Sequence, residues 1–225
     1  MASVLTVNAA ATPVELGALR TGIDKRPSAQ PLTVRPPGPR RGGLGSGVVG
    51  DSVCNARHHG GDDQAVYVYA REDLDAWQNR LGRNLTNGIF GENLTTSGVD
   101  VTHCLIGERW SIGPDGLVLE ATSPRTPCKT FSTWLGIAGW LKTFTLAAVP
   151  GAYFRVVAPG TVRAGDRIDV IYRPDHGVTI GTVFRALMLE PDLIPTLSVA
   201  DALPEKIKQQ VDRRSSRAGT PAEGT

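Results

Sequence analysis

The chain has 225 residues, of which 40% are hydrophobic, and it carries a formal net charge of +2 at neutral pH. This length and apolar content suffice for one well-buried domain and a small appendage. The charge is too small to indicate a nucleic-acid partner, and no apolar run approaches the roughly 18 residues of a membrane-spanning helix. We therefore expect a globular protein that binds neither nucleic acid nor a membrane.

The cysteines of the chain are few and scattered: Cys54, Cys104 and Cys128. An odd, dispersed set without CxxC spacing argues against a disulfide framework or a zinc ribbon and indicates a reducing compartment. The alanine-rich start lacks the basic segment and the continuous apolar run of a secretory leader. We expect the protein to be cytoplasmic.

The N-terminal part of the chain predicts short strands joined by long turns. β-branched runs at 4–7 and 32–34 indicate strands, and residues 21–27 read as a turn closed by proline. Residues 36–50 hold enough proline and glycine to be a mobile surface loop. Glycines at 45, 47 and 50 spell a dinucleotide-type motif, but its neighbouring strand and helix are missing, so we reject that interpretation.

Two adjacent histidines precede the next predicted strand, at 65–69. In an extended chain His58 and His59 point to opposite sides, so they are unsuited to ligating one metal ion together. The run His59-Gly60-Gly61 leaves two alternatives open. It is either a turn before the strand or a close approach of one side chain and bare backbone to an anionic ligand.

The central part of the chain predicts one clear helix and then many short strands. An apolar stripe indicates a helix at 71–81 that stops at Gly82. Short strands at turn-punctuated spacing, with few helices, favour a mainly β, α+β fold built as a barrel or sandwich. The strands are expected at 88–94, 109–112, 117–120, 153–157 and 167–171, with a glycine-weakened helix at 134–144.

Beyond residue 172 the pattern becomes helical. We therefore divide the chain into a β domain at 1–172, a three-helix domain at 173–214 and a disordered tail at 215–225. A helical unit this small cannot bury enough surface to fold alone, so it must pack on the β domain or on a second subunit. The second arrangement would be a homodimer.

A loop at 123–131 holds Cys128 between two cations. Pro124 and Pro127 restrict the backbone, so the loop has little conformational freedom to lose when it binds a ligand. Charge from Arg125 and Lys129 would stabilise a thiolate, which lowers the cysteine pKa and favours nucleophilic or soft-metal chemistry. The alternative is a buried, inert cysteine beside two surface cations.

Four segments keep the order and spacing of one known family. They are Thr21-Gly22-Ile23-Asp24-Lys25, His59-Gly60-Gly61 followed by Ala65-Val66-Tyr67, Gly91-Glu92-Asn93-Leu94, and Ser123-Pro124-Arg125-Thr126-Pro127-Cys128. Together they resemble the MOSC domain (molybdenum cofactor sulfurase C-terminal domain), in the YiiM-like branch that carries a C-terminal three-helix domain. The resemblance covers the chain from about residue 4 to 214.

The resemblance implies a partly open MOSC β-barrel that binds the molybdenum cofactor, with Cys128 as both metal ligand and catalytic residue. Charge and close backbone approach would anchor the phosphate of the cofactor, and polar side chains would bond the pterin edges. For the polar side chains, stabilisation of turns is the alternative. The cofactor-binding residues implied are Lys25, His59, Gly60, Gly61, Gly91, Glu92, Asn93 and Arg125.

YiiM-like proteins reduce N-hydroxylated substrates, so the resemblance implies two-electron reduction of a hydroxylaminopurine-type R-NHOH to R-NH2 and water. Asp62 stands where relatives often have proline, which puts the substrate in doubt more than the cofactor. The chain lacks ferredoxin cysteine spacing and a nucleotide fold, so a separate flavin or iron-sulfur protein would supply electrons. The alternative is a non-catalytic carrier in which Cys128 holds a persulfide or delivers cofactor.

Overall fold

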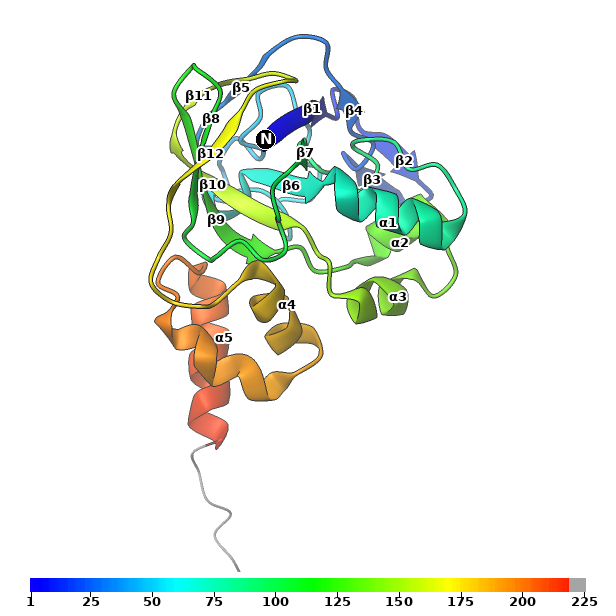
Figure 1. Ribbon diagram of the computed structural model, residues 1–225. Coiled ribbons are helices and arrows are strands. Elements are labelled where there is room, and N and C mark those ends of the chain that lie inside the picture. The colour runs from blue at the N-terminus through cyan, green and yellow to red at the C-terminus, as the bar shows by residue number, and fades with distance from the viewer. Residues whose placement is uncertain (219–225) are drawn as a thin grey trace, which may run out of the picture.

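The computed structural model describes residues 1–218. Most strands form one eight-stranded sheet, and two pairs of short strands form separate small sheets. One group of helices flanks the sheet and another lies together at the C-terminal end of the molecule (Figure 1). The strands are β1 Ser3–Ala9, β2 Val14–Leu16, β3 Leu19–Thr21, β4 Arg26–Pro27, β5 Leu32–Val34, β6 Val66–Ala70, β7 Leu94–Ser97, β8 Arg109–Ile112, β9 Leu117–Pro124, β10 Ala152–Ala158, β11 Gly160–Val162 and β12 Ile168–Tyr172.

The main sheet follows the order β12-β8-β9-β10-β6-β7-β1-β4 and is antiparallel except where β6 meets β7. The start of β1 reaches the opposite edge through an isolated bridge between Ser3 and Arg167. Next to it, the Val4 amide donates to the Asp166 carbonyl at 2.8 Å. No strand pairing closes the sheet within residues 1–218, so the prediction of a mainly β, partly open barrel is confirmed.

The helices confirm the most local predictions. They are α1 Arg71–Leu81, α2 Lys129–Leu135, α3 Trp140–Ala147, α4 Ile180–Met188 and α5 Glu205–Ala218, with 3-10 helices η1 Asp62–Gln64 and η2 Pro191–Val199. The helix predicted at 71–81 is present with those bounds, and Gly82 ends it in the left-handed conformation at φ 62°.

Two predicted elements differ from the structure, and glycine explains both. The helix predicted at 134–144 is interrupted, because Gly136 and Gly139 adopt φ of 65° and 70° and separate α2 from α3. The strand predicted at 88–94 is a loop up to β7. Gly88 there has φ 88°, and a Cβ on it would lie 2.3 Å from the Lys25 carbonyl oxygen.

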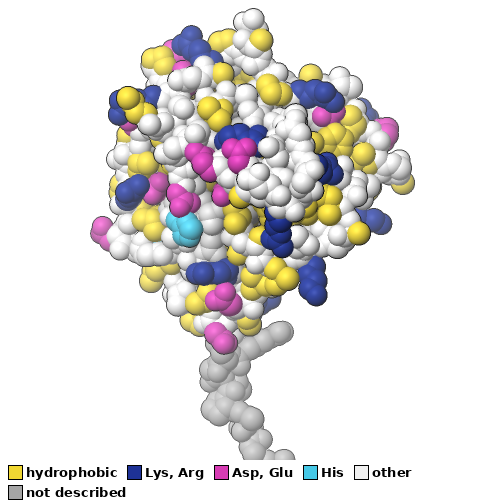
Figure 2. Space-filling model, turned by 45° about the vertical axis from the view of Figure 1, so that its right-hand side comes forward, with side chains coloured by type: hydrophobic (Ala, Val, Ile, Leu, Met, Phe, Trp, Pro, Cys, Tyr) yellow, Lys and Arg dark blue, Asp and Glu magenta, His cyan; other side chains and the backbone are white. Residues whose placement is uncertain are grey.

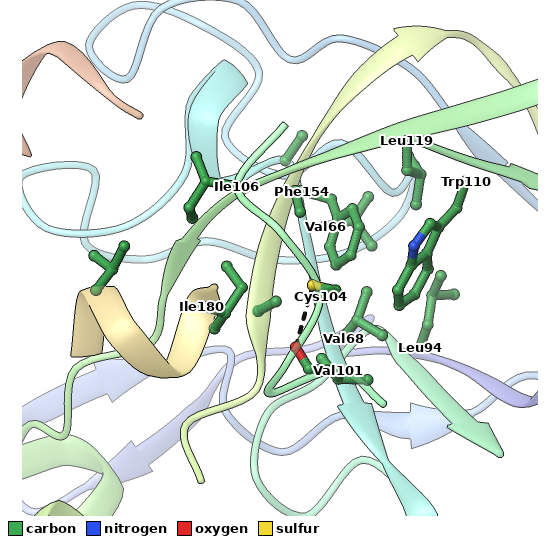
Figure 3. Packing of buried hydrophobic residues seen from close by; sticks show 14 of the residues in the cluster. Val66, Val68, Leu94, Val101, Cys104, Ile106, Trp110, Leu119, Phe154 and Ile180 are labelled. Carbon is green, nitrogen blue, oxygen red and sulfur yellow. Dashed lines mark hydrogen bonds between the residues drawn. The ribbon is translucent and has the colours of Figure 1, made fainter. Parts of the chain in front are cut away.

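The sheet encloses an apolar core in which β6, β8 and β10 contribute Val66, Trp110 and Phe154 (Figure 3). The rings of Trp110 and Phe154 lie 4.6 Å apart. Cys104 belongs to this core, and its thiol donates to the Val101 carbonyl at 3.2 Å. Burial raises the pKa of Cys104 well above the ordinary thiol value, so this cysteine is a packing residue.

A second, aromatic cluster lies under α1, α2 and α3. The Phe90 ring meets the Phe131 ring edge to face at 5.0 Å, and Phe131 meets Phe144 in the same way at 5.2 Å. Trp77 of α1 and Trp140 of α3 join the cluster at 4.8 Å from each other. Edge-to-face contacts of this kind fix ring orientation, so the cluster forms a rigid floor beside the loop that contains Phe90.

After β12 the chain forms α4, η2 and α5, which lie together beneath the sheet (Figure 1). Arg155 of β10 joins the two parts, because its guanidinium donates to the Ala202 carbonyl at 3.0 Å. Helix α5 extends to Ala218, so the predicted tail at 215–225 overlaps the helix in its first four residues. The remaining seven residues of that prediction lie outside the described part of the chain.

Charged and apolar side chains are interspersed on the face shown in Figure 2, without one extended patch of either sign. Among the described residues, no helix has the length and apolar character needed to cross a membrane.

Candidate functional site

A cavity opens where the loops at one end of the sheet converge. It encloses about 840 Å³ of space between protein atoms, a volume that includes its open mouth. Its walls come from β3 and the turn after it, the loop 46–60, the loop before β7, the connection from β9 to α2, and single residues of β6 and β10. These segments are distant in sequence, and the sheet brings them together.

Seven of the nine residues predicted for the site line this cavity: Lys25, His59, Gly60, Gly91, Asn93, Arg125 and Cys128. Gly61 and Glu92 are not among the residues that line it. The four family-like segments therefore meet at one place, although not every residue in them faces the same space.

Cys128 occupies the connection between β9 and α2, directly before the first residue of the helix. It is half-buried, and its carbonyl accepts a hydrogen bond from the Ser132 amide at 3.1 Å. Lys129 is exposed and does not line the cavity. Of the two cations expected beside the thiol, Arg125 lines the cavity and Lys129 does not.

Arg125 is a buried cation, 5% exposed, on the cavity wall. Its Nη1 donates to the Phe90 carbonyl at 2.9 Å, and its guanidinium carbon lies 3.7 Å from the centre of the Phe131 ring. It forms no ion pair with a carboxylate in the part of the chain that the structure describes. A carbonyl group and an aromatic face carry no formal charge, so they leave the positive charge of the guanidinium unneutralised. The guanidinium can therefore bind an anionic ligand.

Lys25, the other predicted phosphate anchor, already has a partner. Its ammonium group bonds both oxygens of the Asp51 carboxylate, and the two side chains are 9% and 1% exposed. Asp51 was not predicted, and it also accepts from the Ser46 hydroxyl at 2.7 Å and from the Asn93 amide at 2.9 Å. Asp51 thereby ties three parts of the cavity wall together, and its partners at Lys25 and Asn93 lie far away in sequence.

His59 lines the cavity as a neutral side chain. Burial, followed by the charge of Arg125, lowers its pKa to about 4. The glycines after it serve close packing between loops. A Cβ on Gly60 would lie 2.7 Å from the Gly45 carbonyl oxygen, and one on Gly61 would lie 2.9 Å from the Arg40 backbone. Both glycines therefore allow the loop 36–50 to approach the histidine loop.

Glu92 braces the loop before β7 from within the protein. It is fully buried, and burial raises the pKa of its carboxyl group. The carboxyl group accepts hydrogen bonds from the Gly88 amide, the Phe90 amide at 3.0 Å and the Thr95 hydroxyl at 2.9 Å. This places it behind the loop, so it positions Phe90 and Gly91 instead of meeting a ligand itself.

Gln64, Tyr67 and Tyr153 are among the cavity residues that were not predicted. The oxygen Oε1 of Gln64 is buried without a hydrogen-bond partner. The Tyr67 hydroxyl donates to the Pro150 carbonyl at 2.8 Å, and the Tyr67 and Tyr153 rings lie 5.0 Å apart. Tyr67 and Tyr153 have the signature of ordinary strand residues, and Gln64 stands in a short polar run before a strand, which is why no local signal identified them.

The structure is thus a partly open β-barrel in which one cavity carries a cysteine and a buried arginine that has no carboxylate partner among the described residues. Residues 55–169 match the MOSC domain family. The chain belongs to this family.

Relatives support the assignment. The chain is 30% identical over 162 residues to the uncharacterized protein YflK of Bacillus subtilis, covering 72% of this chain and 68% of YflK. It is 26% identical over 132 residues to the protein YiiM of Escherichia coli, covering 56% of this chain and 57% of YiiM. A protein of Gibberella moniliformis named "Reductase" is 30% identical over 132 residues, which are 57% of this chain and 23% of that protein.

A solved structure shows the same fold over nearly the full length. The crystal structure of YiiM from Geobacillus stearothermophilus superposes with a TM-score of 0.75 at 22% identity, covering 95% of this chain and 99% of that one. The similarity includes the C-terminal helices, because a match of this extent leaves little of either chain unpaired.

Proposed function

We propose that this protein binds the molybdenum cofactor and reduces N-hydroxylated compounds of the hydroxylaminopurine type. The observation that carries the proposal is that the Cys128 thiol and the buried Arg125 guanidinium line the same cavity. A thiolate is a suitable ligand for molybdenum, and an uncompensated guanidinium suits a phosphate. These two groups match the two chemically distinct ends of a phosphorylated metal-pterin cofactor.

The rest of the cavity wall also fits this cofactor. Gln64 presents a buried amide oxygen without a donor, which an N–H group on a pterin edge would satisfy. Gly91 has φ 78° and lacks a side chain, so a ligand can approach its backbone closely. Asp51 and Glu92 hold the surrounding loops in place through internal hydrogen bonds, so the cavity is formed before a ligand enters.

When bound, the cofactor would supply the two-electron redox chemistry that no protein side chain of this cavity offers. Cys128 would fix the metal end, and Arg125 would fix the phosphate end and neutralise its charge. The neutral His59 would offer ring nitrogens for hydrogen bonds without adding positive charge. Electrons would come from a separate flavin or iron-sulfur protein.

The names of relatives add support from outside the cavity. One relative is named a reductase, although this chain matches only 23% of it. The family as a whole is named for its relation to the molybdenum cofactor sulfurase, and the present chain contains its cysteine loop at 123–128.

The first test is the molybdenum and pterin content per polypeptide, in a host that makes the cofactor. Wild type should hold near-stoichiometric metal, and Cys128→Ser should lose most of it because a neutral hydroxyl is a far weaker ligand than a thiolate. Cys54→Ser is the matched control, since Cys54 also lines the cavity but is exposed and assigned no ligand role. It should keep its metal.

The same measurement distinguishes the proposed function from the competing one, a sulfur carrier. Wild type that lacks molybdenum but releases sulfur on treatment with cyanide, through Cys128, would be a sulfur carrier. Loss of metal that is equal in both serine variants would remove the special role of Cys128. If wild type holds molybdenum, it should reduce N6-hydroxyadenine to adenine with a reduced viologen dye as electron donor.

A further inference from the structure

Tyr153 is a cavity residue to which the proposed cofactor contacts assign no task. Tyr153 lies on β10 and lines the cavity together with Cys128 and Arg125. Its hydroxyl group takes part in none of the hydrogen bonds formed within residues 1–218, whereas its backbone carbonyl accepts from the Thr122 hydroxyl at 3.0 Å. The backbone is therefore fixed while the phenol group faces an open space.

The other polar groups that face this cavity are largely committed. The Lys25, Ser46 and Asn93 side chains all donate to Asp51. Tyr67 donates its hydroxyl to the Pro150 carbonyl at 2.8 Å. The Tyr153 hydroxyl is not among the buried side-chain atoms that lack a partner, so a molecule inside the cavity can reach it and accept its hydrogen bond.

The local backbone explains why Tyr153 points where it does. The register between β9 and β10 shifts between Tyr153 and Phe154, and such bulges redirect a side chain. On the neighbouring strand Tyr153 pairs with Tyr67, and the two rings lie 5.0 Å apart. Tyr67, packed against the ring and bonded at its own hydroxyl, holds the Tyr153 ring in its orientation.

We propose that Tyr153 donates a hydrogen bond to the hydroxylamino oxygen of the substrate and thereby distinguishes R-NHOH from the product R-NH2. This role rests on the proposed function. A phenol O–H suits this task because it donates one directed hydrogen bond from a rigid aromatic support. The product lacks the oxygen and leaves the phenol unpaired, so it binds more weakly and is released.

The same contact would favour the reaction itself. The N–O bond breaks as two electrons from the reduced flavin or iron-sulfur partner and two protons from solvent enter, giving the amine and water. Negative charge develops on the leaving oxygen during this cleavage, and a donor already directed at that oxygen stabilises the charge. Tyr153 thus contributes to kcat as well as to substrate preference.

The test compares wild type, Tyr153→Phe and Tyr172→Phe, with molybdenum content measured first. Each is titrated calorimetrically with N6-hydroxyadenine and with adenine, and the ratio of the two dissociation constants is the readout. Wild type should prefer the hydroxylated base by about tenfold, the scale of one hydrogen bond with its unpaired penalty. Tyr153→Phe should bring the ratio close to one, and Tyr172→Phe, which removes the hydroxyl of an exposed tyrosine outside the cavity, should keep the preference.

The outcomes separate this role from the proposed function. If Tyr153→Phe keeps both the preference and the wild-type kcat/KM with reduced viologen, the role of Tyr153 is overturned although the enzyme stands. If wild type holds molybdenum but binds neither base, both the substrate class and the role of Tyr153 fail. If wild type holds no molybdenum, the cofactor assignment fails, and titration of the same metal-free protein still decides whether Tyr153 reads the hydroxyl oxygen.

Discussion

His59 shows how burial sets the chemistry of a single residue. An exposed histidine titrates close to neutrality, but desolvation and the nearby Arg125 charge lower the pKa of His59 to about 4. At neutral pH the side chain is therefore uncharged and can accept a hydrogen bond. Arg125 is a buried positive charge of the cavity, while the charge of Lys25 is neutralised by Asp51.

The lowered pKa of His59 predicts a stability change on the acid side. The unfolded chain binds a proton below about pH 6.5 and the folded chain only near pH 4, so stability is lost as the pH falls through this window. The loss is at most about 3 kcal/mol. Urea unfolding of the cofactor-free protein at pH 7 and near pH 4 should show this loss in wild type and not in His59→Asn.

A second buried group makes the comparison with a variant necessary. Burial raises the pKa of Asp73 to about 6, which lowers stability as the pH rises through the same range, opposite in sign to His59. Because both proteins contain Asp73, its effect cancels in the difference. His58→Asn controls for an added asparagine in the loop. The prediction would be contradicted if the free energy of unfolding fell equally in wild type and His59→Asn between pH 7 and pH 4.

At the scale of elements, the outcome of sequence reasoning depends on how local the cause is. Helix α1 was predictable because its apolar stripe and its terminal Gly82 lie within one segment. Asp51 was not, because its partners Lys25 and Asn93 lie 26 and 42 residues away and only the fold brings them together. The cysteine loop was predictable because Arg125 and Cys128 are neighbours in sequence.

The loop before β7 supports the cavity through Glu92. In Glu92→Gln one carboxylate oxygen becomes an NH2 group, which would face a donor at Gly88 or Phe90. We expect a loss of about 1–3 kcal/mol, the cost of an unsatisfied buried group, measured by urea unfolding. Metal content should fall as well, because the Phe90 carbonyl holds Arg125.

Glu72→Gln is the matched control for this loop. Glu72 also accepts from a glycine amide and a hydroxyl group, at 2.8 Å from both Gly98 and Ser97, but at an exposed site. Water can replace those bonds, so its loss should stay below about 1 kcal/mol. If Glu92→Gln and Glu72→Gln lower the free energy of unfolding equally, burial of Glu92 does not explain its contribution to stability.

At the scale of the molecule, Arg155 connects the sheet with the C-terminal helices. Its guanidinium bonds Glu120 at 3.1 Å and Asp63 at 2.6 Å, and it also reaches the Ala202 carbonyl. One side chain thus holds strand β9, the 3-10 helix beside the cavity and the segment before α5. The proposed division at residue 172 therefore separates two parts that are stabilised together.

Arg155→Met tests this connection, since methionine keeps much of the apolar stem and removes the donors. The variant should lose about 1–3 kcal/mol, because Glu120, 9% exposed at its side chain, loses one of its two cationic partners. The rate of backbone amide hydrogen exchange should rise more in α4 and α5 than in β6. Arg167→Met, which removes an exposed ion pair with Asp169, is the control and should change neither measurement by much. If exchange in α4 and α5 is unchanged in Arg155→Met, packing between apolar faces holds the helices to the sheet, and the arginine contributes to the sheet alone.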